Sequence, residues 1–408
     1  MRPTLENAAI ALYSNSPYQP TGYGQQAGYL VERLKREQAQ VAALTNYGLM
    51  GNNSKIETPH GDVKHYAASF DPYGNDIHPA NYRHFATMHP DKQKLLITLY
   101  DTWVLDIKAW ARVPRILSWT PLDHLTIPDR VLAWIKQEHV TPIAMAPFGQ
   151  RQMESHGIEC EYIPHAIDTE IFKPTLTIGE QPAREVLGID DETWLVGMVA
   201  ANKADSGLHR KAFYENLLAF SIFKQTHKDA KIYLHTDAHG SAGGWNLSQI
   251  LTKVGLDEND VIMPNQVIYR WGHTQQEMAA IFSAFDVYLG TSYGEGFGIG
   301  TIESQSAGTP AIVSNFAASP DLVAPEYRMT ANEGGLLVDG QPIWHPGLAA
   351  PFAVPNVGGI VKALENAYKL ERGANQVART WALNFDADKV FDEQWVPLLQ
   401  KTLQTEQA

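Results

Sequence analysis

The chain has 408 residues, of which 44% are apolar, and a net charge of −13. This length fits two domains of ordinary size, and the composition is that of a folded globular protein rather than a disordered one. The acidic balance counts against a protein that binds nucleic acid through general positive charge. The single cysteine, Cys160, excludes an internal disulfide and a zinc site built from cysteines.

The sequence also predicts where the protein is found. No apolar run reaches the roughly 18 residues that a membrane span requires. Residues 1–16 contain a short apolar stretch without a basic leader or a cleavage motif, so we expect a first strand there rather than a signal peptide. With its lone cysteine, the chain is expected to be cytoplasmic and to have no integral membrane association.

In the first half of the chain, short apolar runs alternate with amphipathic segments. Strand-like runs lie at 8–14, 40–44, 94–100, 115–119 and 141–146, and helical spacing occurs at 23–38, 128–138 and 147–156. Continuous apolar strands separated by helices predict a parallel sheet covered on both faces. We place this first doubly wound domain at residues 1–172.

The same pattern restarts after a segment at 161–182 that is rich in Pro and Gly. Strand-like runs at 194–200, 230–236 and 286–290 alternate with helical segments at 211–226 and near 274–284, and a further helix is expected to begin near Gly298. This predicts a second α/β domain at residues 173–379. The tail, residues 380–408, is predicted to be helical and to pack on either domain, the first included.

Two doubly wound domains joined by one linker predict a cleft between them. In open parallel sheets, ligands bind beyond the carboxyl ends of the strands. The loops that follow strands are therefore the places where chemistry is expected.

The loop after the first strand has the sequence SNSPYQPTGYGQQ (14–26). Gly22 and Gly24 allow close approach to the backbone, and the helix that follows offers unpaired N–H groups to an anion. The loop lacks the GxGxxG pattern of dinucleotide-binding proteins. A plain strand-to-helix turn is an equally good interpretation of this segment alone.

Weaker candidates follow other strands of the first half. Asp101 follows one strand, the pair Asp123 and His124 follows another, and His165 lies at the predicted linker. Acids or a histidine in these places are candidates to face the cleft, although a histidine in a loop is more often an ordinary packing residue.

The segment ANKADSGLHRKAFYEN (201–216) brings Lys203, Arg210 and Lys211 to the carboxyl end of a predicted strand. Arginine suits bidentate contacts with phosphate, and lysine provides a mobile point charge for the same purpose. The alternative is a solvated basic loop that precedes a helix. The location favours an anion-binding role.

The stretch TSYGEGFGIGTIESQ (291–305) places four glycines around Glu295 and before Glu303. A helix N-terminus there carries about half a positive charge and several free N–H donors. Because Glu303 lies about a turn and a half inside the helix, the two acids do not act as one pair on one bond. We expect them to contact different parts of one extended ligand whose phosphates rest on the helix N-terminus, which is the shape of a sugar nucleotide. A glycine-rich turn with Glu295 as a helix-end charge explains neither the glycines nor Glu303.

The segment from Glu295 to Glu303 resembles the E-x7-E signature of retaining glycosyltransferases with the GT-B fold, family GT4 in particular. The longer stretch 281–315 and the linker sequence IPHAIDTEIFKP (163–174) resemble the same family. The resemblance is dense over 161–340 and thin in the N-terminal half. It implies a GT-B fold, that is, two Rossmann-like domains facing a cleft, and transfer of a sugar from a nucleotide-diphosphate sugar to an acceptor.

The resemblance implies roles for individual residues of the donor site. Glu295 would contact hydroxyls of the donor sugar, and Glu303 would contact the ribose. The remaining backbone contacts would come from Gly296, Phe297 and Gly298 to the sugar, from Gly300 and Thr301 to the phosphate, and from the loop of Gly22, Tyr23 and Gly24 near the diphosphate.

The family's cationic residues match this sequence only in part. The phosphate-binding lysine corresponds to Lys211, and the family's arginine falls on Ser206. Either Arg210 supplies the second charge or Asn202 takes the arginine's place. Asp123 and His124 lie where an acceptor-side catalytic group is expected.

The implied mechanism uses no cofactor and no metal, because protein cations and the helix N-terminus stabilise the leaving diphosphate. Glu295 is expected to orient the sugar rather than to attack it.

Three other functions fit the same fold: a phosphorylase, a sugar-nucleotide epimerase and a non-catalytic module that binds sugar nucleotides. The acceptor stays open among small molecules, lipids, glycans, proteins and modified nucleic-acid bases. The lack of a basic amphipathic helix in the first half counts against a lipid acceptor at a membrane surface.

Overall fold

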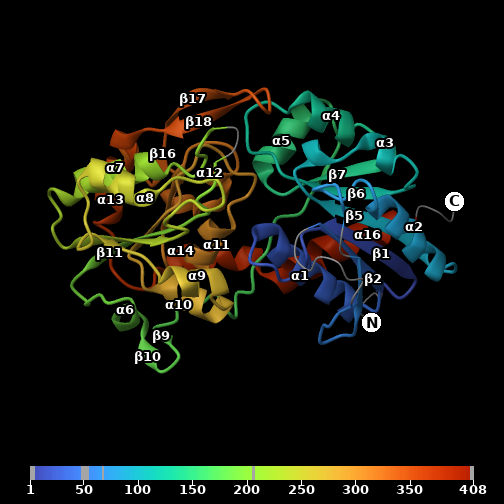
Figure 1. Cartoon of the computed structure of the whole chain (residues 1–408), viewed down its shortest axis with the longest axis horizontal. Coiled ribbons are helices and arrows are strands. Elements are labelled where there is room, and N and C mark those ends of the chain that lie inside the picture. The colour runs from blue at the N-terminus through green and yellow to red at the C-terminus, as the bar shows by residue number, and fades with distance from the viewer. Residues whose placement is uncertain (1–4, 47–54, 67–68, 205–206, 405–408) are drawn as a thin grey trace. The chain divides into compact units, whose positions relative to one another are not determined.

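The computed structural model describes residues 5–46, 55–66, 69–204 and 207–404. The chain forms two compact units (Figure 1). Unit 1 comprises residues 1–122, 127–166 and 387–408, and unit 2 comprises residues 123–126 and 167–386. The division in the linker thus falls at 166/167, six residues before the position expected from the sequence.

Unit 1 is built on an eight-stranded sheet with the strand order β3-β4-β2-β1-β5-β6-β7-β8. All neighbouring strands are parallel except β3 and β4. The strands are β1 (Ala8–Ser14), β2 (Gln40–Thr45), β3 (Lys55–Ile56), β4 (Val63–Tyr66), β5 (Gln93–Leu99), β6 (Ile116–Thr120), β7 (Val140–Ala144) and β8 (Glu161–Tyr162). The helices between them are α1 (Gly22–Arg36), α2 (His78–Met88), α3 (Ile107–Trp110), α4 (Asp129–Ile135) and α5 (Pro147–Ser155).

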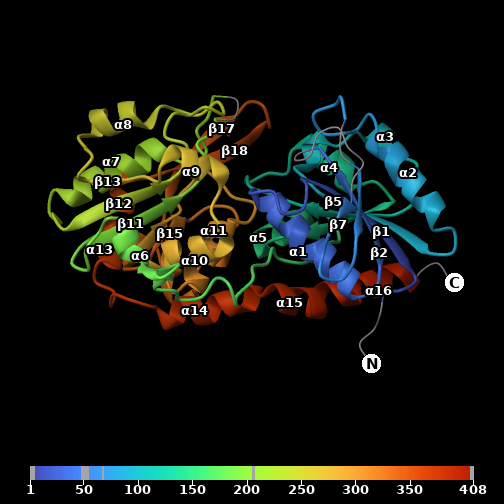
Figure 2. The same ribbon diagram turned by 60° about the horizontal axis from the view of Figure 1, so that its bottom comes forward.

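The C-terminal segment of the described chain belongs to unit 1. It consists of α15 (Ala387–Val390), a π-helical turn (Phe391–Trp395) and α16 (Val396–Gln404). Arg36 of α1 pairs with Asp388 and Asp392, so the segment lies along α1 (Figure 2). The predicted helical tail is therefore present, and it packs on the first of the two α/β units.

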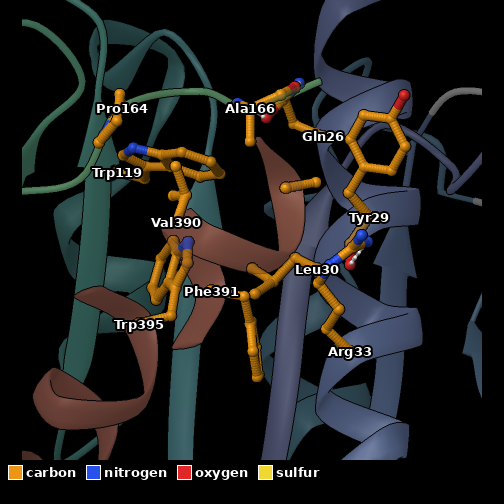
Figure 3. Close-up of a pocket in the computed structure, with 11 residues that line it drawn as sticks. Gln26, Tyr29, Leu30, Arg33, Trp119, Pro164, Ala166, Val390, Phe391 and Trp395 are labelled. Carbon is orange, nitrogen blue, oxygen red and sulfur yellow. Dashed lines mark hydrogen bonds between the residues drawn. The ribbon is translucent and has the colours of Figure 1, made fainter. Parts of the chain in front are cut away.

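Two tryptophans fix this segment to the sheet. The ring of Trp395 stands nearly perpendicular to that of Trp119 on β6, with 5.0 Å between the ring centroids. Both rings, with Val390 and Phe391, line a mainly apolar pocket beside α1 (Figure 3). At its rim the Gln26 amide forms two hydrogen bonds with the backbone of Ala166, the last residue of unit 1 before the linker.

Unit 2 contains a six-stranded parallel sheet with the order β13-β12-β11-β14-β15-β16. Its strands are β11 (Trp194–Val199), β12 (Ala230–His235), β13 (Val261–Ile262), β14 (Val287–Leu289), β15 (Ala311–Ser314) and β16 (Leu337–Val338). Its helices are α6 (Ala183–Val186), α7 (Phe213–Lys224), α8 (Leu247–Val254), α9 (Gln266–Trp271), α10 (Gln275–Ser283), α11 (Ile299–Ser306), α12 (Ser319–Leu322), α13 (Val357–Ala367) and α14 (Gln376–Ala382).

The core of unit 2 explains why these segments fold together. Buried side chains of β11, β12 and β14 pack against apolar residues of α7 and α13 in one cluster. Two antiparallel hairpins complete the unit: β9 (Thr177–Ile178) with β10 (Gln181–Pro182), and β17 (Gly340–His345) with β18 (Ala350–Pro355). The predicted class, two doubly wound α/β domains, is confirmed. Within the described ranges, no helix is long and apolar enough to cross a membrane.

Candidate functional site

The predicted cations and the first predicted acid meet at one edge of the unit 2 sheet. Arg210 and Lys211 lie between β11 and α7, and Glu295 follows β14. β11 and β14 are neighbours in the sheet, so the loops that follow them lie at the same edge. The Lys211 ammonium is 2.5 Å from Oε1 of Glu295, and the Arg210 guanidinium is 3.7 Å from Oε2.

The backbone around these residues is held by hydrogen bonds between the two loops. The N–H of Tyr293 donates to the carbonyl of Arg210 at 2.7 Å. The amide of Asn216 on α7 donates to the carbonyl of Thr291 at 3.2 Å, and the hydroxyl of Thr291 donates to the Asn216 carbonyl oxygen. These contacts fix both cations relative to Glu295.

Asp123 and His124 extend this group. The short segment Asp123–Thr126 belongs to unit 2, although it follows β6 of unit 1 in sequence. Arg210 Nη1 donates to Oδ2 of Asp123 at 2.8 Å and to the carbonyl of Gly294 at 2.9 Å. Nδ1 of His124 is 2.5 Å from Oδ1 of Asp123. The five side chains of Lys211, Glu295, Arg210, Asp123 and His124 therefore form one continuous polar chain.

The two carboxyl groups in this chain are stabilised as anions. Burial raises the pKa of Glu295, but the charges of Lys211 and Arg210 outweigh burial, and the net pKa lies below its ordinary value. Burial likewise raises the pKa of Asp123, and the hydrogen bond from His124 together with the charge of Arg210 brings the net pKa below its ordinary value. Both groups are therefore carboxylates at neutral pH.

His124 has one nitrogen that this chain of contacts does not use. The residue is 3% exposed, and its Nε2 has no hydrogen-bond partner within the described ranges. A buried polar atom without a partner is unfavourable unless a ligand or water pairs it. His124 is therefore suited to hydrogen-bond a substrate through Nε2.

The predicted helix after Glu295 is α11, and its glycines serve several purposes. Gly298 is the N-cap and has φ 98°, a conformation that favours glycine. A Cβ on Gly300 would lie 2.7 Å from the hydroxyl of Tyr288, and one on Gly294 would lie 2.1 Å from the carbonyl of Asp123. Close packing thus requires glycine at 294 and 300 whether or not a ligand is bound.

The other residues predicted around α11 differ in exposure. Thr301 is buried in the first turn, and its N–H donates to the Gly298 carbonyl at 3.0 Å. Gly296 and Glu303 are partly exposed, Glu303 one turn along the helix. The ring of Phe297 is 4% exposed, and its centroid lies 5.8 Å from that of Phe385, so its side chain packs inside unit 2.

Asn202, the alternative to Arg210, has a structural role. Its side-chain amide donates to the carbonyls of Asp237 and Trp245, each at 2.7 Å, and accepts from the N–H of Trp245 at 3.0 Å. The amide therefore anchors the loop after β12, whereas Arg210 contacts Glu295 directly. Lys203 is exposed to solvent, and Ser206 lies outside the described residues.

The glycine loop near α1 belongs to unit 1. Thr21 is the N-cap of α1, and its hydroxyl accepts from the N–H of Gly24 at 3.0 Å. A Cβ on Gly24 would lie 2.6 Å from the carbonyl of Gln19, so the turn itself requires this glycine. Gly22 is exposed, and the hydroxyl of Tyr23 donates to Asp101 at 2.8 Å.

His165, the weak linker candidate, is a packing residue of unit 1. Its ring centroid lies 4.6 Å from that of Trp119, and the side chain is buried. Burial lowers the pKa of His165 to about 3, so it is neutral at physiological pH.

The sequence interpretation missed Phe352, which supports the site from β18. Its ring centroid lies 5.9 Å from that of His124, and its edge would be 2.7 Å from a Cβ on Gly294. The N–H of Ala353 donates to the carbonyl of Tyr293 at 2.9 Å. The sequence signal for this strand was weak, because β18 begins near one proline and ends at another, and a proline within an apolar run argues against a strand.

Comparisons with known proteins show which family this part of the chain resembles. Residues 209–343 match the family model described as "Glycosyl transferases group 1". Curated relatives include a D-inositol 3-phosphate glycosyltransferase from Corynebacterium urealyticum, 24% identical over 188 residues, which are 46% of this chain and 41% of the relative. Another, from Mycobacterium sp. strain JLS, is 27% identical over 171 residues, 38% of this chain and 35% of the relative. The matches thus span less than half of each relative's length.

Solved structures align over nearly the whole chain. A sucrose-phosphate synthase from Thermosynechococcus elongatus has a TM-score of 0.70 at 17% identity and covers 98% of this chain and 100% of its own. An alpha,alpha-trehalose 6-phosphate synthase from Burkholderia multivorans has a TM-score of 0.68 at 12% identity, with the same coverage. A trehalose-6-phosphate structure from E. coli with bound UDP-2-fluoro glucose has a TM-score of 0.63 at 14% identity and covers 97% and 99%. At these identities the likeness shows a shared fold.

Proposed function

Because the chain has the GT-B fold and belongs with the group 1 glycosyltransferases through residues 209–343, we propose that it transfers a sugar from a nucleotide-diphosphate sugar to a hydroxyl acceptor. The anomeric configuration is retained, and neither a metal ion nor a cofactor takes part. The donor is held by unit 2, which contains the matched segment.

The observation that carries this proposal is the group of Lys211, Arg210 and Glu295 next to the N-terminus of α11. A leaving nucleoside diphosphate develops negative charge as the glycosidic bond breaks. Two fixed cations and the N–H groups of a helix end stabilise that charge without reorganisation during the reaction. This supply of positive charge takes the place that a metal ion has in other enzymes.

Glu295 orients the donor sugar in this proposal. Its depressed pKa keeps it ionised, so its oxygens accept hydrogen bonds from sugar hydroxyls. Holding the sugar in a reactive orientation lowers the entropic part of the barrier. Glu303, farther along α11, binds the ribose, and the backbone of residues 296–301 contacts the sugar and the phosphates. The retaining outcome rests on the likeness to the E-x7-E signature.

The first experiment identifies the donor. The melting temperature of the full chain is measured with UDP-, GDP- and ADP-glucose and, separately, with UDP, GDP and ADP. The nucleotide that raises the melting temperature is the one that the chain binds. UDP-glucose is the first choice, since the E. coli neighbour binds a UDP-glucose analogue. Release of the nucleoside diphosphate is then followed with a panel of hydroxyl acceptors.

The decisive variant is Glu295→Ala. We expect loss of transfer with donor binding retained, and Glu258→Ala, an exposed acid of unit 2, serves as the matched control. Unchanged sugar transfer by Glu295→Ala would contradict the proposal. Interconversion of the donor sugar without any acceptor would identify an epimerase, a requirement for inorganic phosphate would identify a phosphorylase, and donor binding without turnover would identify a non-catalytic module.

A further inference from the structure

Arg210 and Lys211 occupy the two central positions of one tight turn. The N–H of Ala212 donates to the carbonyl of His209 at 2.9 Å, and this bond closes the turn. Because both cations lie between these two residues, a movement of the turn displaces both of them relative to Glu295. The contacts that hold the turn therefore place the two cations together.

The turn ends in a backbone conformation that needs support from its surroundings. Ala212 is the N-cap of α7 and has φ 51°, in the left-handed region that is uncommon for a residue with a Cβ. Such a conformation costs free energy and persists only where neighbouring contacts impose it. Ala212 is fully buried, so neighbouring elements surround it on all sides.

Hydrogen bonds hold the middle of the turn. The carbonyl of Arg210 accepts from the N–H of Tyr293, after β14, at 2.7 Å. The carbonyl of Lys211 accepts from the side-chain amide of Asn216, on α7, at 3.4 Å. These bonds connect the central residues of the turn to β14 and to α7.

Aromatic packing holds the first residue of the turn, His209. Its ring centroid lies 4.1 Å from that of Trp245, with 36° between the ring planes, and 5.7 Å from that of Phe213. His209 is 2% exposed, and neither ring nitrogen has a hydrogen-bond partner in the described part of the chain. Burial lowers the pKa of His209, so the ring is neutral at physiological pH. The side chain thus holds the turn by packing and not by hydrogen bonds.

Trp245 has a fixed backbone from which to support this ring. It lies on the loop after β12 (residues 236–246), and the side-chain amide of Asn202 binds both its N–H and its carbonyl. A Cβ on Gly244 would lie 2.2 Å from the carbonyl oxygen of Asn202, so the loops after β11 and β12 are in direct contact. The Trp245 ring therefore forms a support for His209 that the neighbouring loop holds in place.

We propose that His209 and Trp245 are positioning residues of the donor site: their packed rings hold the turn in the arrangement in which Arg210 and Lys211 both meet the donor diphosphate. The inference rests on the proposed function, which assigns these two cations to the diphosphate. The two rings act on the donor only through the cations. A displacement of about 1 Å in a positioned group is enough to lower a reaction rate by about a hundredfold, so packing behind the turn matters for transfer.

The test is calorimetric titration of the full chain with the nucleoside diphosphate that raises its melting temperature. His209→Ala and Trp245→Ala are expected to raise the Kd of the diphosphate by about tenfold, the scale of one lost hydrogen bond to a charged group. The matching nucleoside monophosphate has one phosphate fewer, so its Kd should rise by about threefold or less. With an acceptor, kcat should fall by about tenfold or more in both variants.

Conservative variants separate packing from hydrogen bonding. His209→Phe keeps a buried ring and replaces two unpaired nitrogens by carbon, so we expect nearly wild-type affinity for the diphosphate and an unchanged or higher melting temperature. Trp245→Phe keeps a smaller ring and should lie between the wild type and Trp245→Ala. The matched controls are His239→Ala, at an exposed histidine on the same loop, and Trp344→Ala, at an exposed tryptophan of unit 2. Both controls should leave the two Kd values unchanged.

A double-mutant comparison shows whether the rings act through the cations. In the Lys211→Met background, Trp245→Ala should raise the Kd of the diphosphate by about threefold or less, because one of the two cations that the ring places is already absent. Circular dichroism checks that each variant is folded.

Three results would overturn the inference: equal weakening of the diphosphate and the monophosphate, a folded His209→Phe variant that loses as much affinity as His209→Ala, or an equal effect of Trp245→Ala with and without Lys211. In each case the wild type still binds the sugar nucleotide, and the proposed function stands. Failure of the proposed function appears in the wild type itself, because then no sugar nucleotide or nucleoside diphosphate raises the melting temperature and none is turned over.

Discussion

At the scale of single residues, the site depends on a small number of opposed charges. Glu295 and Asp123 are both carboxylates in a partly buried environment, and Lys211 and Arg210 compensate them. Removing one member leaves another without its partner, which costs more than an exposed ion pair contributes. The group therefore responds to substitution both in activity and in stability.

Lys211→Met is expected to lower kcat by about 10²–10³, the range measured for loss of one preorganised group that stabilises developing charge. It also leaves Glu295 with Arg210 as its only cation in this group, so the melting temperature should fall. Lys203→Met, at an exposed lysine on the same loop, provides the control for charge. Equal kcat values in the two variants would remove Lys211 from the donor site.

The pH dependence follows from the direction of the Glu295 shift. Its folded-state pKa lies below the ordinary value of 4.5, so the ionised form contributes stability that is fully present above pH 4.5 and is lost as the pH falls through the folded-state pKa. The melting temperature of the wild type should therefore decline more steeply below pH 4.5 than that of Glu295→Gln. Parallel curves would contradict the assignment of the lowered pKa.

Among the glycines of the candidate site, Gly294 has the closest contact with a backbone atom. Gly294→Ala places a Cβ 2.1 Å from the carbonyl oxygen of Asp123, and a backbone atom cannot move aside at low cost. We expect loss of transfer with a lower melting temperature. Gly255→Ala is no suitable comparison because its φ is positive, whereas Gly358→Ala, with only a side-chain oxygen 3.2 Å away, should be tolerated.

At the scale of elements, the β17–β18 hairpin connects to the site through Phe352. Phe352→Ala removes the ring that packs on His124 and Gly294. We expect a loss of about 3–5 kcal/mol in the free energy of unfolding and a lower kcat, with a smaller change in donor affinity. Phe352→Leu should restore much of both, and Trp344→Ala, at a 60% exposed position of the same hairpin, should change neither. If Trp344→Ala lowered the free energy of unfolding and kcat as much as Phe352→Ala, these effects would come from the hairpin as a whole and not from the Phe352 ring.

The elements near the candidate site were largely predictable from sequence. Runs such as 8–14 and 194–200 are continuous and apolar because both faces of a parallel sheet are covered, and they appear as β1 and β11 within one residue. The meeting of Lys211 with Glu295 follows from two loops that come after strands of one sheet. The ligand roles of these residues, and of Gly22, Tyr23 and Gly24, stay predictions.

Other features were not predictable because they depend on contacts that are distant in sequence. Asp123–Thr126 groups with unit 2 and contacts it through partners far away in sequence, among them Arg210, 87 positions from Asp123. The packing of Trp395 on Trp119 likewise joins two parts of unit 1 that lie before and after residues 167–386 in sequence. Local pattern contains no information about either partner.

At the scale of the whole molecule, unit 1 depends on a segment that follows all of unit 2 in sequence. Trp395→Ala removes a 3% exposed indole from the contact with Trp119. We expect a loss of about 3–5 kcal/mol in the stability of unit 1, seen by calorimetry as a downward shift of the transition that belongs to this unit. Trp271→Ala, at an 81% exposed tryptophan of unit 2, should leave both transitions in place.

The same feature bears on how the chain folds during synthesis. Domains usually complete their folding in the order in which they leave the ribosome. Here the strands of unit 1 emerge first, but α15, the π-helical turn and α16 emerge only after residues 167–386 have been made. Until then the apolar surface around Trp119 is open to chaperones and to other nascent chains. Unit 2 is therefore expected to reach its final structure first, and the first unit to be translated is the last to be finished.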